Sequence, residues 1–226
     1  MRQRKAKDLD KRLQECSEYM IAEPKTGKLQ DCFENSGELF LEIGCGKGSF
    51  IIKKALENPQ ENFIAIEGQD TVILRALEKV KATVQKGQRA GTGAQVRGAA
   101  LCNLKFMLTF VDTMDEFFEE NQLAGIYLNF SDPWPKARHA KRRLTYRKRL
   151  EDYKWALKPG GFIEIKTDND SLYAFTLEEI AAAGLNIAEQ TEDLHNSDFD
   201  SQNTTTEYEE KFKSSGKTIN YVKVTV

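Results

Sequence analysis

The sequence predicts an α/β fold in which helices cover both faces of a mostly parallel β-sheet. From residue 38 onward, short apolar runs alternate with amphipathic stretches of helical period, which is the pattern of strand–helix units. The first apolar run ends in a glycine-rich turn, a common feature of ligand-binding parallel sheets. We expect residues 1–37 to form a polar N-terminal extension and residues 38–226 a single domain, for which the chain is long enough.

Apolar runs that are short and rich in β-branched or aromatic residues are expected to be strands. Two of them, Leu185–Gln190 and Thr218–Val226, lie near the end of the chain, and we expect a closing antiparallel pair joined by a long polar loop without a helix. The five central strands are expected at Leu39–Ile43, Phe63–Glu67, Phe106–Val111, Ile126–Phe130 and Phe162–Lys166.

Amphipathic stretches between these runs have the apolar spacing of helices. The segment Lys86–Ala100 differs, because it is rich in Gly and Ala, and we expect a flexible surface loop there. The expected helices are Lys7–Met20, Ser49–Glu57, Thr71–Val84, Met114–Asn121, Thr145–Leu157 and Leu172–Ala183.

The composition is that of a soluble globular protein, with 40% hydrophobic and 30% charged residues. No apolar run approaches the roughly 20 residues that span a bilayer, and the basic start leads into no apolar signal segment. We therefore expect the protein in the cytoplasm. The four cysteines form no CxxC pair and there are two histidines, so we expect reduced thiols and no metal site.

A glycine-rich turn, Gly44-Cys-Gly-Lys-Gly48, follows the first expected strand. Alternating glycines permit backbone angles and a close approach of a ligand that a Cβ would block. Glu42 lies two residues before the first glycine, where its carboxylate would repel a pyrophosphate. The same carboxylate would suit the ammonium and sulfonium groups of S-adenosylmethionine. The pattern therefore predicts a site for this cofactor that includes Glu42, Gly44 and Gly46.

Acidic residues also end the next two expected strands. Glu67 ends the second, where a carboxylate can accept hydrogen bonds from both hydroxyls of a ribose. Asp112 ends the third, from which it could reach the adenine or the reaction centre. A cap of the expected helix Met114–Asn121 is an alternative role for Asp112.

A stiff loop with a basic continuation follows the fourth expected strand. Two prolines in Ser131-Asp-Pro-Trp-Pro135 fix φ and remove backbone donors, so that the loop presents Asp132 and Trp134. Between Pro135 and Leu150 there are eight Lys or Arg residues and no acid, although the net charge is −2. Cations suit phosphates and an aromatic ring suits a base, which together predict RNA contact. The alternatives are a solvated basic loop and, for Asp132, a turn-forming role.

Several motifs resemble those of the bacterial tRNA (guanine-N(7)-)-methyltransferase family. The resemblance runs from about residue 38 to the C-terminus and rests most on Asn129-Phe-Ser-Asp-Pro-Trp-Pro-Lys136. It implies a Rossmann-like class I methyltransferase fold, with a seven-stranded, mostly parallel sheet and helices on both faces. The other matching motifs are Glu42-Ile-Gly-Cys-Gly-Lys-Gly48, Arg138-His139, Lys141-Arg-Arg-Leu144, Lys166-Thr-Asp-Asn169 and Thr206-Glu-Tyr-Glu209.

The resemblance implies roles for individual residues. Glu42, Glu67, Asp112 and Asp132 resemble the family's cofactor ligands, and Asp132 also resembles its active-site acid. The segment 86–102 is longer than the family's usual link, which leaves Asn103 as an alternative to Asp112 for the adenine contact. Contacts with tRNA are implied for Lys136, Arg138, His139, Lys141, Arg142, Arg143, Asp168, Thr206, Glu207, Tyr208 and Glu209.

Without the resemblance, the sequence alone favours structural roles for Asp168 and for residues 206–209. Asp168 follows the fifth expected strand and suits a turn, and residues 206–209 suit an exposed acidic loop.

The expected chemistry is methyl transfer to N7 of a guanine in tRNA. N7 carries a lone pair and no proton, so that alignment and electrostatic support suffice without a general base. Asp132 or Asp168 could accept hydrogen bonds from the guanine N1–H and amine. The alternatives are a nucleic-acid methyltransferase for an exocyclic amine, whose Asn-Pro-Pro-Tyr loop is faintly similar to residues 129–135, and a non-catalytic RNA-binding module. The sequence leaves open a monomer or a homodimer.

Overall fold

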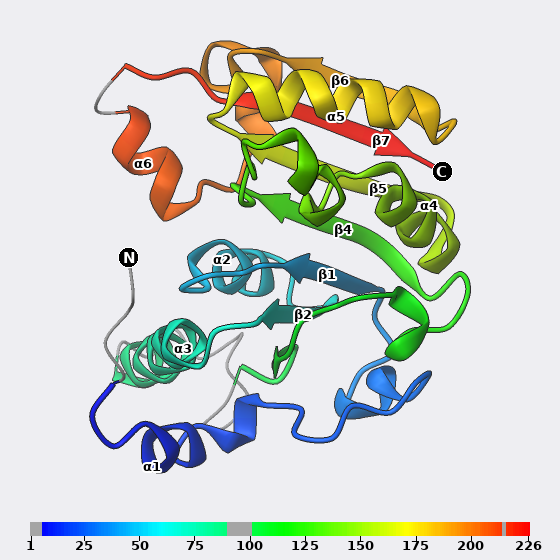
Figure 1. Cartoon of the computed structure of the whole chain (residues 1–226). Coiled ribbons are helices and arrows are strands. Elements are labelled where there is room, and N and C mark those ends of the chain that lie inside the picture. Colours follow the sequence, from blue (N-terminus) through cyan, green and yellow to red (C-terminus); the bar gives the residue numbers. More distant parts are fainter. Residues whose placement is uncertain (1–5, 90–100, 214–215) are drawn as a thin grey trace. The chain divides into compact units, whose positions relative to one another are not determined.

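The computed structural model describes residues 6–89, 101–213 and 216–226 (Figure 1). The chain divides into two compact units, residues 1–112 and 113–226. Residues 90–100 of the expected loop Lys86–Ala100 lie outside the described residues, and residues 86–89 are helical, so the expected loop is wrong for those four residues. No helix in the described part of the chain is both long enough and apolar enough to cross a lipid bilayer.

The first unit contains three parallel strands in the order β3-β2-β1. Strand β2 is buried along almost its whole length, which explains its nearly uninterrupted apolar sequence. Figure 1 shows β1 and β2 pointing the same way, so that the loops that follow them lie on one edge. The elements are β1 (Leu39–Ile43), α2 (Ser49–Glu57), β2 (Asn62–Glu67), α3 (Asp70–Arg89) and β3 (Leu104–Leu108).

The N-terminal segment packs against this unit, although its sequence is polar. The expected helix Lys7–Met20 is divided into α1 (Leu9–Gln14) and a 3-10 turn, Ser17–Tyr19. Cys16 and Tyr19 are buried where the two meet. Backbone N–H of Ile21 donates to the carbonyl of Phe106 on β3 at 2.9 Å, which extends the strand pairing beyond the sheet edge.

The second unit contains four strands in the order β4-β5-β7-β6. Strands β4 and β5 are parallel, and β7 pairs antiparallel with both β5 and β6. The expected closing antiparallel pair is confirmed. The elements are β4 (Leu123–Asn129), α4 (Arg147–Ala156), β5 (Leu157–Thr167), α5 (Asp170–Ala182), β6 (Asn186–Thr191), α6 (Glu207–Lys213) and β7 (Asn220–Thr225).

Two of the expected elements are wrong. Strand β3 ends at Leu108 and not at Val111, because the chain leaves the sheet after the N–H of Thr109 donates to the Glu67 carbonyl at 3.2 Å. The expected helix Met114–Asn121 is only a 3-10 turn, Met114–Glu116. The chain leaves the helical conformation at Phe117, whose φ is −129°, and Asn121 has a left-handed φ of 58°.

The link between β6 and β7 was also expected to lack a helix, and that expectation is wrong. Helix α6 begins with a reciprocal capping box: Thr206 Oγ1 accepts from the N–H of Glu209 at 3.1 Å, and Glu209 Oε2 accepts from the N–H of Thr206 at 2.7 Å. Two further 3-10 turns, Leu194–Asn196 and Asp198–Gln202, precede it.

Candidate active site

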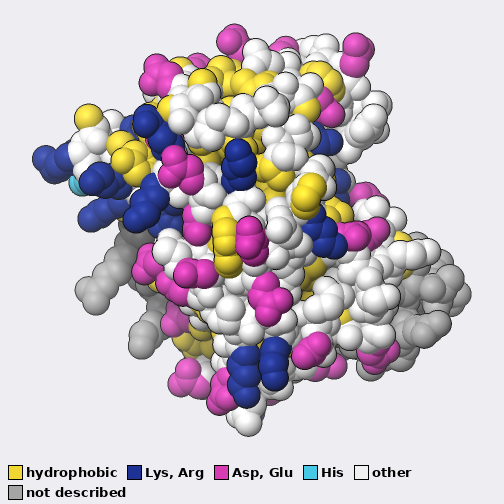
Figure 2. All heavy atoms as spheres, turned by 90° about the vertical axis from the view of Figure 1, so that its right-hand side faces the viewer, with side chains coloured by type: hydrophobic (Ala, Val, Ile, Leu, Met, Phe, Trp, Pro, Cys, Tyr) yellow, Lys and Arg dark blue, Asp and Glu magenta, His cyan; other side chains and the backbone are white. Residues whose placement is uncertain are grey.

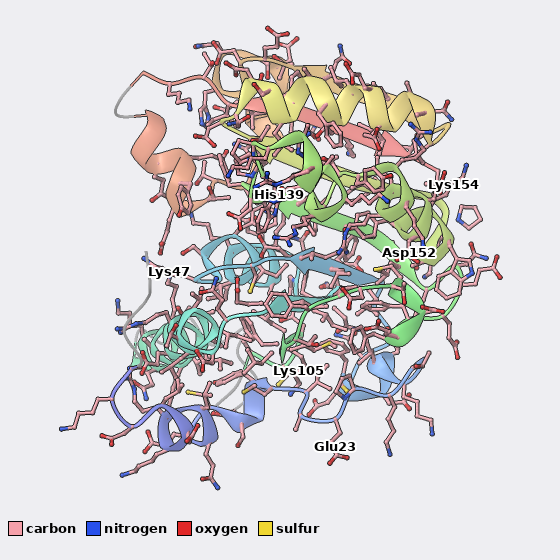
Figure 3. The ribbon with its side chains drawn as sticks, viewed as in Figure 1. Glu23, Lys47, Lys105, His139, Asp152 and Lys154 are labelled. Atoms are coloured by element: carbon pink, nitrogen blue, oxygen red, sulfur yellow. The ribbon has the colours of Figure 1, made fainter. Side chains whose placement is uncertain are left out.

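The glycine turn after β1 leaves an open space at the carboxyl edge of the first unit. Gly44 and Gly46 have φ values of 77° and 57°, and a Cβ on either would meet no atom within 4 Å. Gly48 has a different role, because its Cβ would lie 2.8 Å from that of Ala76 on α3. Figure 3 labels the exposed Lys47 between the second and third glycines. The backbone of the first two glycines is thus available to a ligand.

Two carboxylates lie beside this turn. Glu67 Oε2 accepts from the N–H of Gly46 at 3.1 Å, and Glu67 Oε1 accepts from the N–H of Gln69 at 3.0 Å. Glu42 is 2% exposed at the end of β1. Burial raises the pKa of the Cys45 thiol well above its usual value, and the charges of Glu42 and Glu67 act in the same direction. The turn is therefore a local site of negative potential, which suits a cationic ligand.

Phe110 is a candidate site residue that the sequence did not reveal. Its side chain is 72% exposed, yet its ring lies against Gly68, where a Cβ would be 2.2 Å from ring carbon Cε1. The ring therefore stands beside the end of β2, one residue from Glu67. The expected strand Phe106–Val111 had placed Phe110 inside the sheet, which concealed its position on the edge.

The two candidates for the adenine contact differ in location. Asp112 is exposed and lies four residues beyond the end of β3. Its alternative role as a helix cap is wrong, because Thr113 occupies the cap position of the 3-10 turn.

Asn103 lies at the opposite end of β3, before its first residue. Its side-chain amide is buried and donates to three backbone carbonyls around the end of α2, so it is a structural residue and not an adenine contact. The acceptors are Ala55 at 3.0 Å, Asn58 at 3.1 Å and Glu61 at 3.0 Å.

The loop after β4 is held in an unusual conformation. Phe130 and Trp134 have left-handed φ values of 51° and 41°, which are uncommon for bulky residues. Arg143 fixes the loop, because its Nε donates to the Pro133 carbonyl at 3.0 Å and its Nη2 to the Trp134 carbonyl at 3.1 Å. Asp132 is exposed, and among the described residues its side chain has no hydrogen-bond partner. The carboxylate is thus presented, and its alternative role in a turn is not supported by a hydrogen bond.

The basic segment that follows forms a 3-10 turn, Ala137–Arg142. The Arg142 guanidinium lies 4.9 Å from the centre of the Trp134 ring, which also makes an edge contact with His139 at 5.6 Å (labelled in Figure 3). Figure 2 shows the face of the molecule that is turned by 90° from the view of Figure 1. Lys and Arg side chains gather at the left edge of this view, beside a histidine. The exposed cations of the segment are Lys136, Arg138, Lys141 and Arg142.

Arg143 does not share this exposure. Its guanidinium packs 4.2 Å from the centre of the Phe175 ring while it holds the two loop carbonyls. The sequence placed Arg143 with the phosphate-binding cations, whereas the structure uses it to position the loop that carries Asp132.

The remaining predicted substrate residues divide into exposed and buried ones. Asp168 Oδ2 pairs with Lys217 Nζ at 3.0 Å, and both side chains are partly exposed. Thr206 and Glu209 are buried in the capping box of α6, while Tyr208 is 60% exposed. The alternative of an exposed acidic loop is therefore wrong for residues 206–209.

A buried polar cluster holds the start of α6, and the capping-box spacing of Thr206 and Glu209 is the part of it that the sequence could have indicated. Lys166 at the end of β5 is 1% exposed, and its Nζ lies 3.5 Å from Glu209 Oε2 and donates to the Thr204 carbonyl at 3.0 Å. Asn203 bonds to both charged groups, donating to Glu209 Oε1 at 2.9 Å and accepting from Lys166 Nζ. The cluster ties the chain before α6 to the end of β5.

The strand–helix units and their mostly parallel strands define the Rossmann-like fold of the class I S-adenosylmethionine-dependent methyltransferases. Solved structures agree on the fold. An antibiotic-related methyltransferase has a TM-score of 0.59 at 16% identity, covering 88% of this chain and 92% of its own. An S-adenosylmethionine-dependent methyltransferase from Aquifex aeolicus has a TM-score of 0.51 at 16% identity, covering 97% and 98%.

Sequence comparison identifies the family. The family described as "Putative methyltransferase" matches residues 36–222. A tRNA (guanine-N(7)-)-methyltransferase of Mesoplasma florum is 43% identical over 92% of this chain and 91% of its own, and that of Latilactobacillus sakei is 41% identical over 84% and 82%. The chain belongs to the tRNA (guanine-N(7)-)-methyltransferase family. In the described ranges, no group of three or more potential metal ligands occurs.

Proposed function

We propose that this protein transfers the methyl group of S-adenosylmethionine to N7 of a guanine in tRNA. The observation that carries this proposal is the 43% identity, over nine-tenths of both chains, to a relative with that name. The presented Asp132 loop supports it, because it lies in the motif that most resembles the family.

The first unit would hold the cofactor. The open space at Gly44 and Gly46 admits a ligand against the backbone, and the neighbouring carboxylates suit its cationic groups. Each Glu67 oxygen accepts one backbone hydrogen bond and keeps capacity to accept another from a ribose hydroxyl. Phe110 offers the adenine an aromatic face, and Asp112 is near enough along the chain to bind its polar edge. The bound cofactor supplies an electrophilic methyl group.

The second unit would hold the base. Asp132 can accept hydrogen bonds from the guanine N1–H and amine, which selects guanine over adenine. The negative charge of Asp132 also stabilises the positive charge that the base acquires during methyl transfer. N7 has no proton to lose, so no side chain needs to act as a general base.

The tRNA backbone would contact the exposed cations. Lys136, Arg138, Lys141 and Arg142 can neutralise phosphates, and His139 lies among them. Asp168 would release its ion pair with Lys217 and contact the substrate instead. Thr206 and Glu209 act indirectly, through the start of α6, and leave Glu207 and Tyr208 for direct contact. We also propose that the protein acts in the cytoplasm, where it would encounter tRNA.

The proposal is tested by incubating purified protein with tRNA and S-adenosylmethionine and analysing the nucleosides by mass spectrometry. We expect 7-methylguanosine in amounts that depend on time and on protein. Formation of N2-methylguanosine or N6-methyladenosine would show an exocyclic-amine methyltransferase instead. Binding of tRNA without any methylated nucleoside would show a non-catalytic RNA-binding module.

A further inference from the structure

His195 is a buried titratable residue that the proposed reaction does not use. It lies in the 3-10 turn Leu194–Asn196, and its side chain is 9% exposed. The preceding residue, Leu194, belongs to a buried cluster with Ile219 and Tyr221, and its N–H donates to the Ile219 carbonyl at 2.9 Å. The imidazole is therefore held on a fixed base in the link between β6 and β7.

The two ring nitrogens of His195 face carboxylates on different elements. Nδ1 lies 2.9 Å from Asp200 Oδ1, on the 3-10 turn Asp198–Gln202. Nε2 lies 3.9 Å from Glu209 Oε1, on the first turn of α6. Asn203 bridges the same two acids, because its amide donates to Asp200 at 3.3 Å and to Glu209 at 2.9 Å. The imidazole thus stands between the 3-10 turns and the start of α6.

These contacts indicate how many protons the ring carries. If Nδ1 donates to Asp200, a neutral ring has a lone pair and no proton at Nε2, which is buried and has no hydrogen-bond partner in the described part of the chain. The other neutral tautomer would place a lone pair 2.9 Å from the Asp200 carboxylate. Only the doubly protonated ring presents a donor to Asp200 and a positive N–H to Glu209.

The charges around the ring favour the same state. They are Glu164 and Lys166 on β5, Asp193 beside it in the chain, Asp200 on the second 3-10 turn, and Glu209 on α6. Lys166 Nζ lies 3.5 Å from Glu209 Oε2 and 4.0 Å from Glu164 Oε1. This set holds more carboxylates than cations, and unbalanced buried charge is costly. A proton on His195 reduces the imbalance.

We propose that His195 is a positioning residue that acts as an imidazolium. It holds Asp200 and Glu209 together and so fixes the first turn of α6, from which Glu207 and Tyr208 would contact tRNA. The inference therefore rests on the proposed function, and His195 acts through Glu209 and not by touching the substrate. As pH rises and the ring loses its second proton, the positive donor facing Glu209 is lost, the turn loosens, and tRNA binding weakens.

The protonation state can be measured without catalysis, because the chain contains only two histidines, His139 and His195. Long-range 1H–15N spectra distinguish a protonated imidazole from both neutral tautomers, and a His139→Gln sample assigns the two signals. We expect the signal of a doubly protonated ring for His195 at neutral pH. A neutral ring would overturn the inference, even if the protein forms 7-methylguanosine. A protonated ring in a protein that forms no 7-methylguanosine would sustain the charged bridge and contradict the proposed function.

The positioning role is tested by His195→Gln, which keeps a polar side chain and removes the charge. We expect the KM for tRNA to rise about fivefold or more, as for the loss of one charge-assisted hydrogen bond, with S-adenosylmethionine affinity near wild type. In the wild-type protein the KM should rise over the pH range in which the His195 signal titrates, and this rise should be absent from His195→Gln.

Asn196→Ala, an exposed neighbour on the same turn, is the matched control and should keep both the KM and its pH dependence. A purely structural role for His195 would lower the thermal midpoint of His195→Gln and leave the KM for tRNA unchanged. That result, or the same pH dependence of KM in His195→Gln and in the wild-type protein, would overturn the inference.

Discussion

Glu67 Oε2 accepts a hydrogen bond from the backbone N–H of Gly46 at 3.1 Å. The acid that ends β2 therefore fixes the glycine turn that follows β1, in addition to the ribose contact proposed for it. The two halves of the proposed cofactor site are coupled through this one carboxylate. A substitution of Glu67 should disturb both the ribose contact and the turn.

We expect Glu67→Ala to weaken S-adenosylmethionine binding by roughly 2 kcal/mol or more, since it removes charge-assisted hydrogen bonds to the ribose. Glu67→Gln keeps one oxygen acceptor and should weaken binding less. Isothermal titration calorimetry on both folded variants measures the difference. Unchanged affinity in Glu67→Ala would rule out the ribose assignment.

The exposed cations after the loop should control tRNA binding. Replacing Arg138, Lys141 and Arg142 by Ala should raise the KM for tRNA. It should also make the slope of the logarithm of the binding constant against the logarithm of the salt concentration less steep, by about 0.7 to 0.9 for each phosphate that is no longer neutralised. Lys154 on α4, labelled in Figure 3, is exposed and provides a matched control. A salt slope equal to that of the wild-type protein would contradict the assignment of these three residues.

Arg143 should behave differently from its neighbours, because its guanidinium holds two loop carbonyls. A lysine cannot reproduce this forked contact. We expect Arg143→Lys to lower kcat about tenfold, which corresponds to roughly 1.4 kcal/mol, with the salt slope and cofactor affinity near wild type. If the salt dependence of tRNA binding becomes weaker while kcat stays unchanged, Arg143 is a phosphate contact, as the sequence indicated.

Glu209 should be a major determinant of stability. Its removal leaves Lys166, which is 1% exposed, without its nearest carboxylate, and breaking a buried pair in this way costs about 3 kcal/mol or more. Chemical denaturation of Glu209→Ala measures this decrease in the free energy of unfolding. Glu210→Ala, an exposed neighbour, should change stability by less than about 0.5 kcal/mol.

The sequence predicted those features of the fold that follow from local patterns. The bounds of β1 and α2 were predicted as found, because an apolar run, a glycine turn and an amphipathic stretch follow one another directly. The end of β3 was wrong, since Phe110 packs on Gly68 through a contact between distant residues. Helix α6 was missed although Thr206 and Glu209 have the spacing of a capping box, because the helix has only seven residues and its polar sequence lacks a clear apolar stripe.

For the site, the sequence identified which residues cluster but not what each side chain does. Arg142 and Arg143 are adjacent cations, yet the first is exposed over Trp134 and the second is engaged with carbonyls inside the loop. Likewise, Tyr208 and Glu209 are neighbours that α6 turns in opposite directions, to solvent and to the interior. The division between the two arginines depends on tertiary contacts that no spacing rule specifies, whereas the inward position of Glu209 agrees with its capping-box spacing from Thr206.

Replacement of Asp132 by Asn is the most direct test of the proposed chemistry. The change keeps the size of the side chain but removes its charge and adds a donor where guanine offers donors. We expect kcat/KM for 7-methylguanosine formation in tRNA to fall about 100-fold or more, equal to roughly 2.7 kcal/mol, with cofactor affinity and thermal midpoint near wild type. Methylation by Asp132→Asn within a few-fold of the wild-type rate would contradict the guanine-binding role of this carboxylate.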